Sequence, residues 1–208
     1  MKKNEFVTSD WHIGHLKSIM FDKRPFKDLE QMHETLIRNY NATVGENDIC
    51  YFLGDIGFGD MAKDVIPKLN GKKICVRGNH DGSTEKMYNT GFDLVVNSIA
   101  VVICNELVTM THCPLRGLYR ETAINQDGED MKNFNEGDHW HGESRHIKYS
   151  IQNFDQFHLH GHTHKRKGSD VKYGKQWDIG VVGNNYRPVS FSEIEGWIMK
   201  YKRHHDEK

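Results

Sequence analysis

The sequence lacks a long hydrophobic run. Its longest apolar stretch, Ile99 to Cys104, is far short of the roughly 20 residues that a membrane-spanning helix needs. The N-terminal residues MKKNEFVTSD contain no apolar stretch of the kind found in signal peptides. The four cysteines form no C-x-x-C pair, which indicates reduced thiols rather than disulfides. We therefore expect a cytoplasmic protein without a membrane partner.

The sequence also has little net charge. Its 28 Lys and Arg residues nearly balance 29 Asp and Glu residues, which leaves a formal net charge of -1. Such a chain has no overall positive field that attracts nucleic acid, so a nucleic-acid partner stays open but is not indicated. The length of 208 residues is enough for one domain with a sizeable core. No feature of the sequence indicates an oligomeric state.

Short apolar runs alternate with helical patterns along the chain, which predicts an α/β fold. The predicted strands cover residues 5–9, 49–53, 73–77, 94–104, 107–110, 154–159, 171–173 and 177–182. The predicted helices cover residues 28–40, 61–69, 145–153 and about 190–202. The residues at about 116–150 are polar and include glycines, and their apolar residues show no clear periodicity. They predict a loop or lid inserted in a single domain over residues 1–208.

What is abundant is histidine, with 14 residues. Several of these histidines directly follow predicted strands, and so do two aspartates and an asparagine. In layered α/β folds, the loops that bind ligands lie at the ends of the strands. The candidate metal ligands are Asp10, His12, Asp55, Asn79, His112, His162 and His164. Imidazole, carboxylate and amide oxygen together suit Mn, Fe, Zn or Ni better than Ca or Mg.

Seven such side chains are too many for one catalytic metal, which uses three or four protein ligands. They predict two divalent metal ions that share a carboxylate, a centre able to hold a hydroxide and to clamp a phosphoryl group. Each element alone has an ordinary explanation: Asp10 or Asp55 as a turn or cap residue, Gly78-Asn79-His80 as a turn, and His162-Thr163-His164 as a surface tract. Their joint occurrence in this order favours a metal site.

The ordered motifs are Asp10-Trp11-His12, Gly54-Asp55, Gly78-Asn79-His80-Asp81, His112 and Gly161-His162-Thr163-His164. With them the sequence resembles the calcineurin-like metallophosphoesterases. The stretches TSDWHIGH, RPF, LNGKKICVRGNHD and NYRPVS are similar to those of small single-domain bacterial and phage-type members. The resemblance implies a four-layer α-β-β-α sandwich of two mixed sheets flanked by helices.

The resemblance also implies residue roles. One metal would take Asp10, His12, Asp55 and His164; the other would take Asp55, Asn79, His112 and His162. Asp55 would bridge the two ions, with manganese favoured, and the bridging hydroxide would attack phosphorus. His80 would lie near the leaving-group oxygen and donate a proton or stabilise charge. Asp81 or a backbone carbonyl would orient His80.

Other residues are weaker candidates for contacts with the metal ligands or the substrate. His15 follows Gly14 in a pattern shared with nuclease-like relatives, and His160 alternates with the ligands but fits a buried strand position equally well. Arg77 fits a structural role better than a site role. His141 and Arg145 lie in the insertion and would contact the substrate if that segment folds over the site.

The predicted function is a dinuclear-metal-dependent phosphoester hydrolase, with a phosphodiesterase acting on a nucleotide-type or other small substrate favoured. Protein Ser/Thr phosphatases of the family carry an Arg soon after Gly-Asp, whereas here Gly54-Asp55 is followed by Ile-Gly-Phe-Gly-Asp. The alternatives are a phosphomonoesterase or a nuclease with the same site. A non-catalytic metal-binding scaffold is a further alternative, but it predicts lost ligands, and none is lost.

Overall fold

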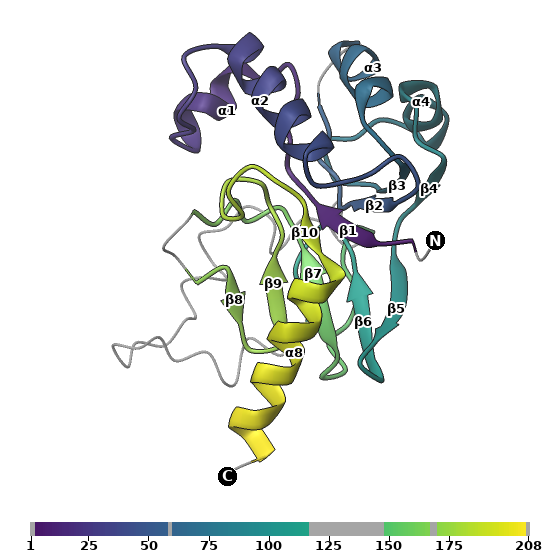
Figure 1. Ribbon diagram of the computed structural model, residues 1–208, viewed down its shortest axis with the longest axis vertical. Coiled ribbons are helices and arrows are strands. Elements are labelled where there is room, and N and C mark those ends of the chain that lie inside the picture. Colours follow the sequence, from purple (N-terminus) through teal and green to yellow (C-terminus); the bar gives the residue numbers. More distant parts are fainter. Residues whose placement is uncertain (1–2, 58–59, 117–147, 167–169, 207–208) are drawn as a thin grey trace.

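Two five-stranded sheets form the protein in the computed structural model, which describes residues 3–57, 60–116, 148–166 and 170–206 (Figure 1). The first sheet has the order β10-β1-β2-β3-β4. Its strands are β1 (Glu5–Thr8), β2 (Ile49–Phe52), β3 (Lys72–Val76), β4 (Leu94–Val96) and β10 (Val189–Ser190). Strands β1 to β4 run parallel, and β10 pairs antiparallel with β1.

The second sheet has the order β5-β6-β7-β9-β8. Its strands are β5 (Ile99–Ile103), β6 (Glu106–Met110), β7 (Phe157–His160), β8 (Lys172–Tyr173) and β9 (Gln176–Asp178). The central strands β6, β7 and β9 are parallel, whereas β5 and β8 join the edges antiparallel. Both sheets are therefore mixed, as predicted.

Helices flank the sheets (Figure 1). Among the described residues they are α1 (Leu16–Phe21), α2 (Leu29–Asn41), α3 (Met61–Val65), the 3₁₀-helix η1 (Ile66–Lys68), α4 (Thr84–Thr90) and α8 (Phe191–Asp206). Helix α2 begins where the Asp28 carboxylate accepts the N–H of Gln31, a cap that the sequence predicts. Its apolar stripe packs on the first sheet, where Tyr40 stacks on Phe52 with ring centroids 5.7 Å apart.

A second core lies between the two sheets and α8. Val7 and Leu53 from the first sheet share it with Met110 and Leu159 from the second. Helix α8 adds Trp197, whose ring meets Phe157 edge-on at 5.3 Å between centroids. The predicted capping box holds the start of this helix, because the Ser190 hydroxyl accepts the Glu193 N–H while the Glu193 carboxylate accepts the Ser190 N–H. No helix among the described residues is long and apolar enough to span a membrane.

The parallel strands bring their carboxyl ends to one junction between the sheets. Backbone hydrogen bonds join the loops that leave these ends: the Asp10 N–H donates to the Gly54 carbonyl at 3.1 Å, and the Gly161 N–H donates to the His112 carbonyl at 2.9 Å. Ser9 bridges to Gly180, which ties the end of β1 to the chain after β9. The Asp55 N–H also donates to Asp81 after β3, and the His162 N–H donates to Asp10, so the loops that follow β1, β2, β3, β6 and β7 meet.

Some predicted elements are wrong. Residues 148–153 of the predicted helix 145–153 form turns and a bridge between Arg116 and Gln152, because they tie the chain back to the loop after β6. The predicted strand 94–104 breaks at Asn97-Ser98, and its halves enter different sheets as β4 and β5. The predicted strand 177–182 ends at Asp178. Most of the predicted insertion, residues 117–147, lies outside the described residues.

Candidate metal centre

Four of the predicted ligands form one buried group. Each of Asp10, His12, Asp55 and His164 offers a ligand atom, and these atoms all lie within 4.8 Å of one another. The His12 Nε2 atom is 3.0 Å from the Nε2 of His164, which in turn is 3.5 Å from an Asp10 oxygen. The first three side chains are almost fully buried, and they come from the loops after β1 and β2. The fourth comes from the loop after β7.

The other predicted ligands form a second group next to the first. The Asn79 Oδ1 atom lies 2.9 Å from His112 Nε2 and 3.1 Å from His162 Nδ1. The Asp55 carboxylate reaches both groups: its Oδ1 is 3.3 Å from His112 Nε2, while its Oδ2 is 3.8 Å from His12 Nε2. The two oxygens of one carboxylate thus face different sets of ligands, which is the arrangement that a bridging ligand needs.

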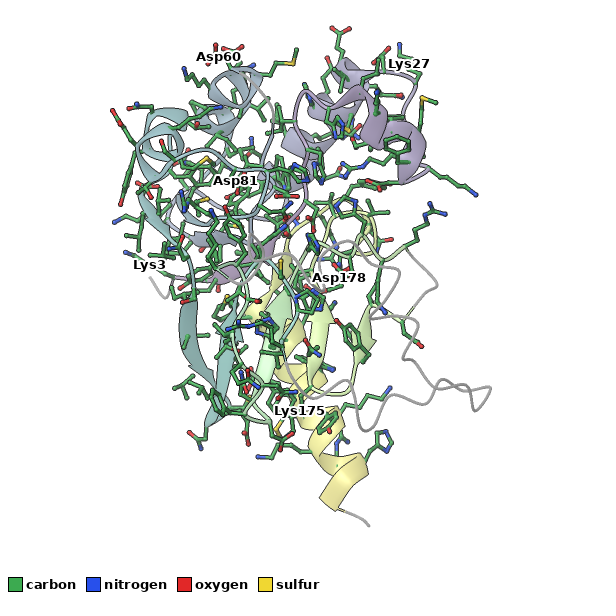
Figure 2. All side chains as sticks on the ribbon, turned by 180° about the vertical axis from the view of Figure 1, so that it is seen from behind. Lys3, Lys27, Asp60, Asp81, Lys175 and Asp178 are labelled. Atoms are coloured by element: carbon green, nitrogen blue, oxygen red, sulfur yellow. The ribbon has the colours of Figure 1, made fainter. Side chains whose placement is uncertain are left out.

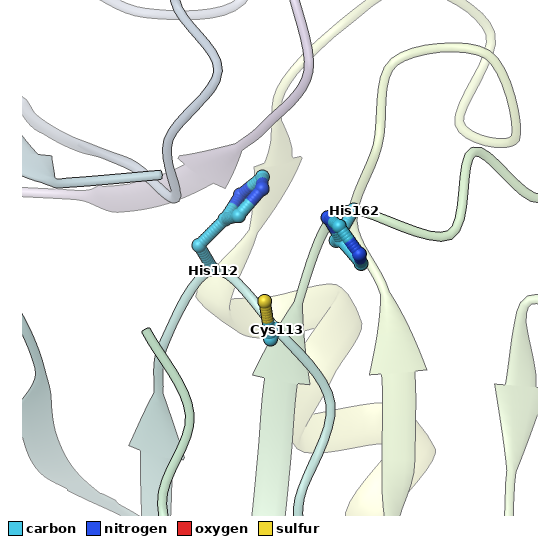
Figure 3. Close-up of side chains that lie close together, drawn as sticks. All are labelled: His112, Cys113 and His162. Atoms are coloured by element: carbon cyan, nitrogen blue, oxygen red, sulfur yellow. The ribbon is translucent and has the colours of Figure 1, made fainter. Parts of the chain in front are cut away.

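Cys113 is a neighbour that the sequence analysis did not single out. Its sulfur forms a compact group with the side chains of His112 and His162, which converge from the loops after β6 and β7 (Figure 3). Burial, with the nearby charges of Asp55 and Asp10, raises the pKa of the Cys113 thiol well above its usual value. A protonated thiol is a poor metal ligand, so Asn79 is the better third donor beside the two histidines.

The ligand backbone is unusual. Five predicted ligands have a positive φ: Asp10 (59°), His12 (52°), Asp55 (53°), His162 (69°) and His164 (47°). This left-handed conformation is uncommon for residues with a side chain and costs of order 1–3 kcal/mol each. Strain of this kind persists where the surrounding structure enforces it, and it concentrates at functional sites.

Two glycines allow the loops to approach one another. A Cβ atom at Gly78 would collide with an Asp55 carboxylate oxygen, and one at Gly161 would collide with an Asp10 oxygen and the Ser9 hydroxyl. The motifs Gly-Asn-His and Gly-His-x-His therefore need glycine at their first position because another residue would displace the ligands themselves.

The charges of the site suit a cation. Burial alone would raise the pKa values of Asp10 and Asp55, but contacts with His164 and His112 respectively outweigh it, so both carboxyls titrate below their usual range. Burial lowers the pKa of His112, yet Asp55 raises it to about 9. Burial and the charge of His164 lower the pKa of His12 to about 3, which keeps that ring neutral. Two carboxylates and converging imidazole nitrogens are the donor set that a divalent metal requires.

Asp22 and Arg24 complete the site, and the sequence analysis missed their role. The Asp22 Oδ1 atom lies 2.9 Å from His164 Nδ1, which leaves the Nε2 atom of that ring facing the ligand group. Buried Arg24 donates to Asp22 Oδ2 at 3.0 and 2.9 Å and to the backbone carbonyls of Asp10 and Trp11. A carboxylate behind a ligating histidine fixes its orientation and raises its basicity. The RPF stretch contained this signal, but its arginine was noted only as part of the resemblance.

Asp178 supports the loop after β7 in a similar way. Its carboxylate accepts hydrogen bonds from the Thr163 hydroxyl, the Lys165 N–H and the Gly180 N–H. Burial and the charge of Asp10 raise the pKa of the Asp178 carboxyl. Asp81 and Asp178 lie near the junction of the two sheets (Figure 2). Asp178 thus shapes the segment that carries two ligands, although no motif pointed to it.

The structure places His80 at the open side of the site. Its side chain is 51% exposed, and its Nε2 atom is 4.0 Å from an Asp55 oxygen. Asp81 accepts the backbone N–H groups of Gly78, Asp55 and Ile56 at 2.7 to 3.0 Å. It therefore joins the loops after β2 and β3, which is a positioning role.

The weaker candidates lie around this centre. The ring of His15 is 5.7 Å from that of His12. His160 is fully buried in β7, where it contacts the Gly161 carbonyl and the Tyr173 hydroxyl. Arg77 binds the Gly82 carbonyl and Asn97, as a structural residue would. The last two candidates, His141 and Arg145, lie outside the described residues.

Substituting Asp22→Asn is expected to weaken divalent-metal binding roughly 10- to 100-fold, because His164 loses the carboxylate that orients it. Equilibrium dialysis of the metal-free protein against manganese measures this change. Asp28→Asn is a matched control, since asparagine caps α2 as well as aspartate does. Unchanged manganese affinity in a folded Asp22→Asn protein would contradict the role given to this carboxylate.

The metal-free protein is expected to lose stability as the pH rises through about 9. The folded-state pKa of His112 is about 9, above the ordinary 6.5, so the His112–Asp55 pair stabilises the fold fully below pH 6.5 and loses this effect as the imidazolium deprotonates. Thermal unfolding with a chelator, from pH 6.5 to above 9, measures the decline. The Asp55→Asn variant should show a flatter decline; an equally steep one would count against this pairing.

The sequence is similar to those of several known proteins. The sequence model of the calcineurin-like phosphoesterase family matches residues 6–166. An uncharacterized protein of Methanocaldococcus jannaschii is 40% identical over 205 residues, which cover 95% of this chain and 92% of that protein. The Gene 66 protein of Mycobacterium phage L5 is 30% identical over 167 residues and 77% of each chain.

A solved structure shows the same fold. The crystal structure of a protein of unknown function from Aquifex aeolicus superposes with a TM-score of 0.66 at 22% identity, over 94% of this chain and 100% of that one. The family match spans most of the chain and includes every predicted metal ligand. The chain belongs to the calcineurin-like phosphoesterase family.

Proposed function

We propose that this protein is a phosphodiesterase that uses two divalent metal ions. The observation that carries the proposal is the position of Asp55, whose two carboxylate oxygens face two separate groups of ligands. Asp10, His12 and His164 would hold one ion, and Asn79, His112 and His162 the other. A pair of such ions supplies Lewis acidity to a phosphoryl group and a nucleophile from water.

The protein's own residues contribute orientation and proton transfer. Asp22 and Arg24 hold His164, and Asp178 holds the loop on which His164 and His162 lie. His80 is half-exposed beside Asp55, where its ring can reach a leaving-group oxygen and donate a proton to it. Both sheets supply ligands, which supports one catalytic domain formed by the two sheets together.

Within this proposal we favour a phosphodiester as the substrate and manganese as the metal ion. No arginine follows Gly54-Asp55 in the position that protein phosphatases of the family use, which supports a small diester substrate over a phosphoprotein. The mixed nitrogen and oxygen ligands support manganese, iron, zinc or nickel rather than calcium. Among these ions we favour manganese.

An assay of the metal-reconstituted protein tests this function. A generic aryl phosphodiester and the matching monoester should be compared with manganese, nickel, zinc and magnesium. We expect turnover of the diester with manganese to exceed that of the monoester. Faster monoester turnover would make the protein a phosphomonoesterase, and no turnover with any ion would overturn the proposal. Cyclic nucleotides and single-stranded DNA then separate nucleotide hydrolysis from nuclease activity.

His80→Ala is expected to keep the metal content and to lower kcat by roughly 10²- to 10⁴-fold, the usual contribution of a general acid. Elemental analysis and steady-state kinetics on the aryl diester measure the two quantities. His204→Ala, which removes an exposed histidine of α8, is the control. A His80→Ala protein that loses its metals would show that the ring acts as a ligand instead.

A further inference from the structure

A large cavity lies on the second sheet beside α8, separate from the metal centre. Its volume is about 840 Å³, and its walls come from β8, β9, residues 183–189 and the exposed side of α8. None of the predicted metal ligands lines it. Part of its wall is the NYRPVS stretch, which the proposed function leaves without a role: Asn185, Arg187 and Val189 all face the cavity. A cavity of this size can hold a small organic ligand.

The rim of the cavity is positively charged. Lys172, Lys200 and Arg187 line it, and among the described lining residues Glu193 is the one that is acidic. Glu193 is already paired, because it accepts two hydrogen bonds from Arg187 at 2.7 and 3.2 Å and one from the Ser190 N–H. The two lysines therefore leave an excess of positive charge, which favours an anionic occupant.

Lys172 is held over an aromatic surface. Its ammonium lies 3.5 Å from the centroid of the Trp177 ring, a cation–π contact. Burial lowers the pKa of Lys172; Glu193 opposes this effect and Lys200 adds to it. An ammonium that has lost part of its hydration gains more from an anion than a fully solvated one does. Trp177, Val189 and Tyr201 also give the cavity apolar walls.

One wall of the cavity contains a glycine, Gly196. It lies in the middle of α8, where glycine destabilises a helix relative to alanine. A Cβ atom at this position would meet no heavy atom within 4 Å, so no contact of the fold requires glycine there. Its bare backbone forms part of the cavity wall. A side chain at this position would occupy the space that a ligand would use.

We propose that this cavity binds a nucleoside monophosphate or an organic anion of similar shape. The phosphate would lie between Lys172 and Lys200, and the planar ring would pack on the apolar wall beside Gly196. A free inorganic phosphate would leave most of the 840 Å³ unfilled, whereas an uncharged nucleoside would bring no anion to the two lysines. The ligand therefore needs both a phosphate and a planar ring. This proposal does not depend on the proposed phosphodiesterase activity.

Isothermal titration of the full chain in a chelating buffer tests the proposal with three probes: AMP, adenosine and inorganic phosphate. We expect AMP to bind roughly tenfold or more tightly than either part alone. Gly196→Leu fills the cavity and should weaken AMP binding by a similar factor, as should Lys172→Gln with Lys200→Gln. Gly196→Ala is the matched control, because it favours the helix and leaves most of the space.

A variant of the catalytic centre locates the bound AMP. Asp55→Asn should leave AMP binding unchanged if the ligand lies beside α8. Loss of binding in Asp55→Asn with retention in Gly196→Leu would place AMP in the catalytic centre and overturn the proposal. Absence of AMP binding at millimolar concentration, or equal binding of phosphate alone, would also overturn it.

Discussion

The Asp55 carboxylate is the constraint on which the rest of the site depends. It is almost fully buried, and each of its oxygens faces a different group of ligands. A buried carboxylate is costly unless hydrogen bonds and opposite charges compensate for its lost hydration. Here the backbone N–H of His80 donates a hydrogen bond to this carboxylate, and the His112 ring supplies a compensating positive charge. The loop after β3 must therefore lie against the loop after β2, and only glycine at position 78 permits that approach.

The two sheets depend on the same centre. Each sheet alone delivers only part of the ligand set, since Asp10, Asp55 and Asn79 follow strands of the first sheet and His112, His162 and His164 follow strands of the second. Arg24 and Asp22 join these halves, because they tie the backbone of Asp10 to the ring of His164. The apolar core between the sheets packs them against each other and so fixes the relative positions of their strand ends. The strain in five ligand backbones is thus opposed by packing on both sides of the junction.

The gathering of the predicted ligands at one junction was predictable from the sequence because their signal is local. Each motif combines a strand end with a glycine and a chemically competent side chain, and parallel strands bring their ends together without further information. Asp22 and Asp178 were not predictable in this way, since a lone aspartate has many uses and their partners lie 142 and 15 residues away. The helix predicted at 145–153 failed for a related reason. In this segment Gln152 pairs with Arg116, which lies far away in the sequence.

The buried histidines show how a polar centre extends into a core. His158 and His160 point to one side of β7, and their rings stack at 5.8 Å. Burial lowers the pKa of His158 to about 4, so it stays neutral and exchanges hydrogen bonds with Thr109 and Thr111. His160 contacts the carbonyl of Gly161, the residue before His162. The alternating histidines of this segment therefore have two environments. The rings of His158 and His160 form hydrogen bonds inside the core, whereas the rings of His162 and His164, beyond the strand, lie in the predicted metal centre.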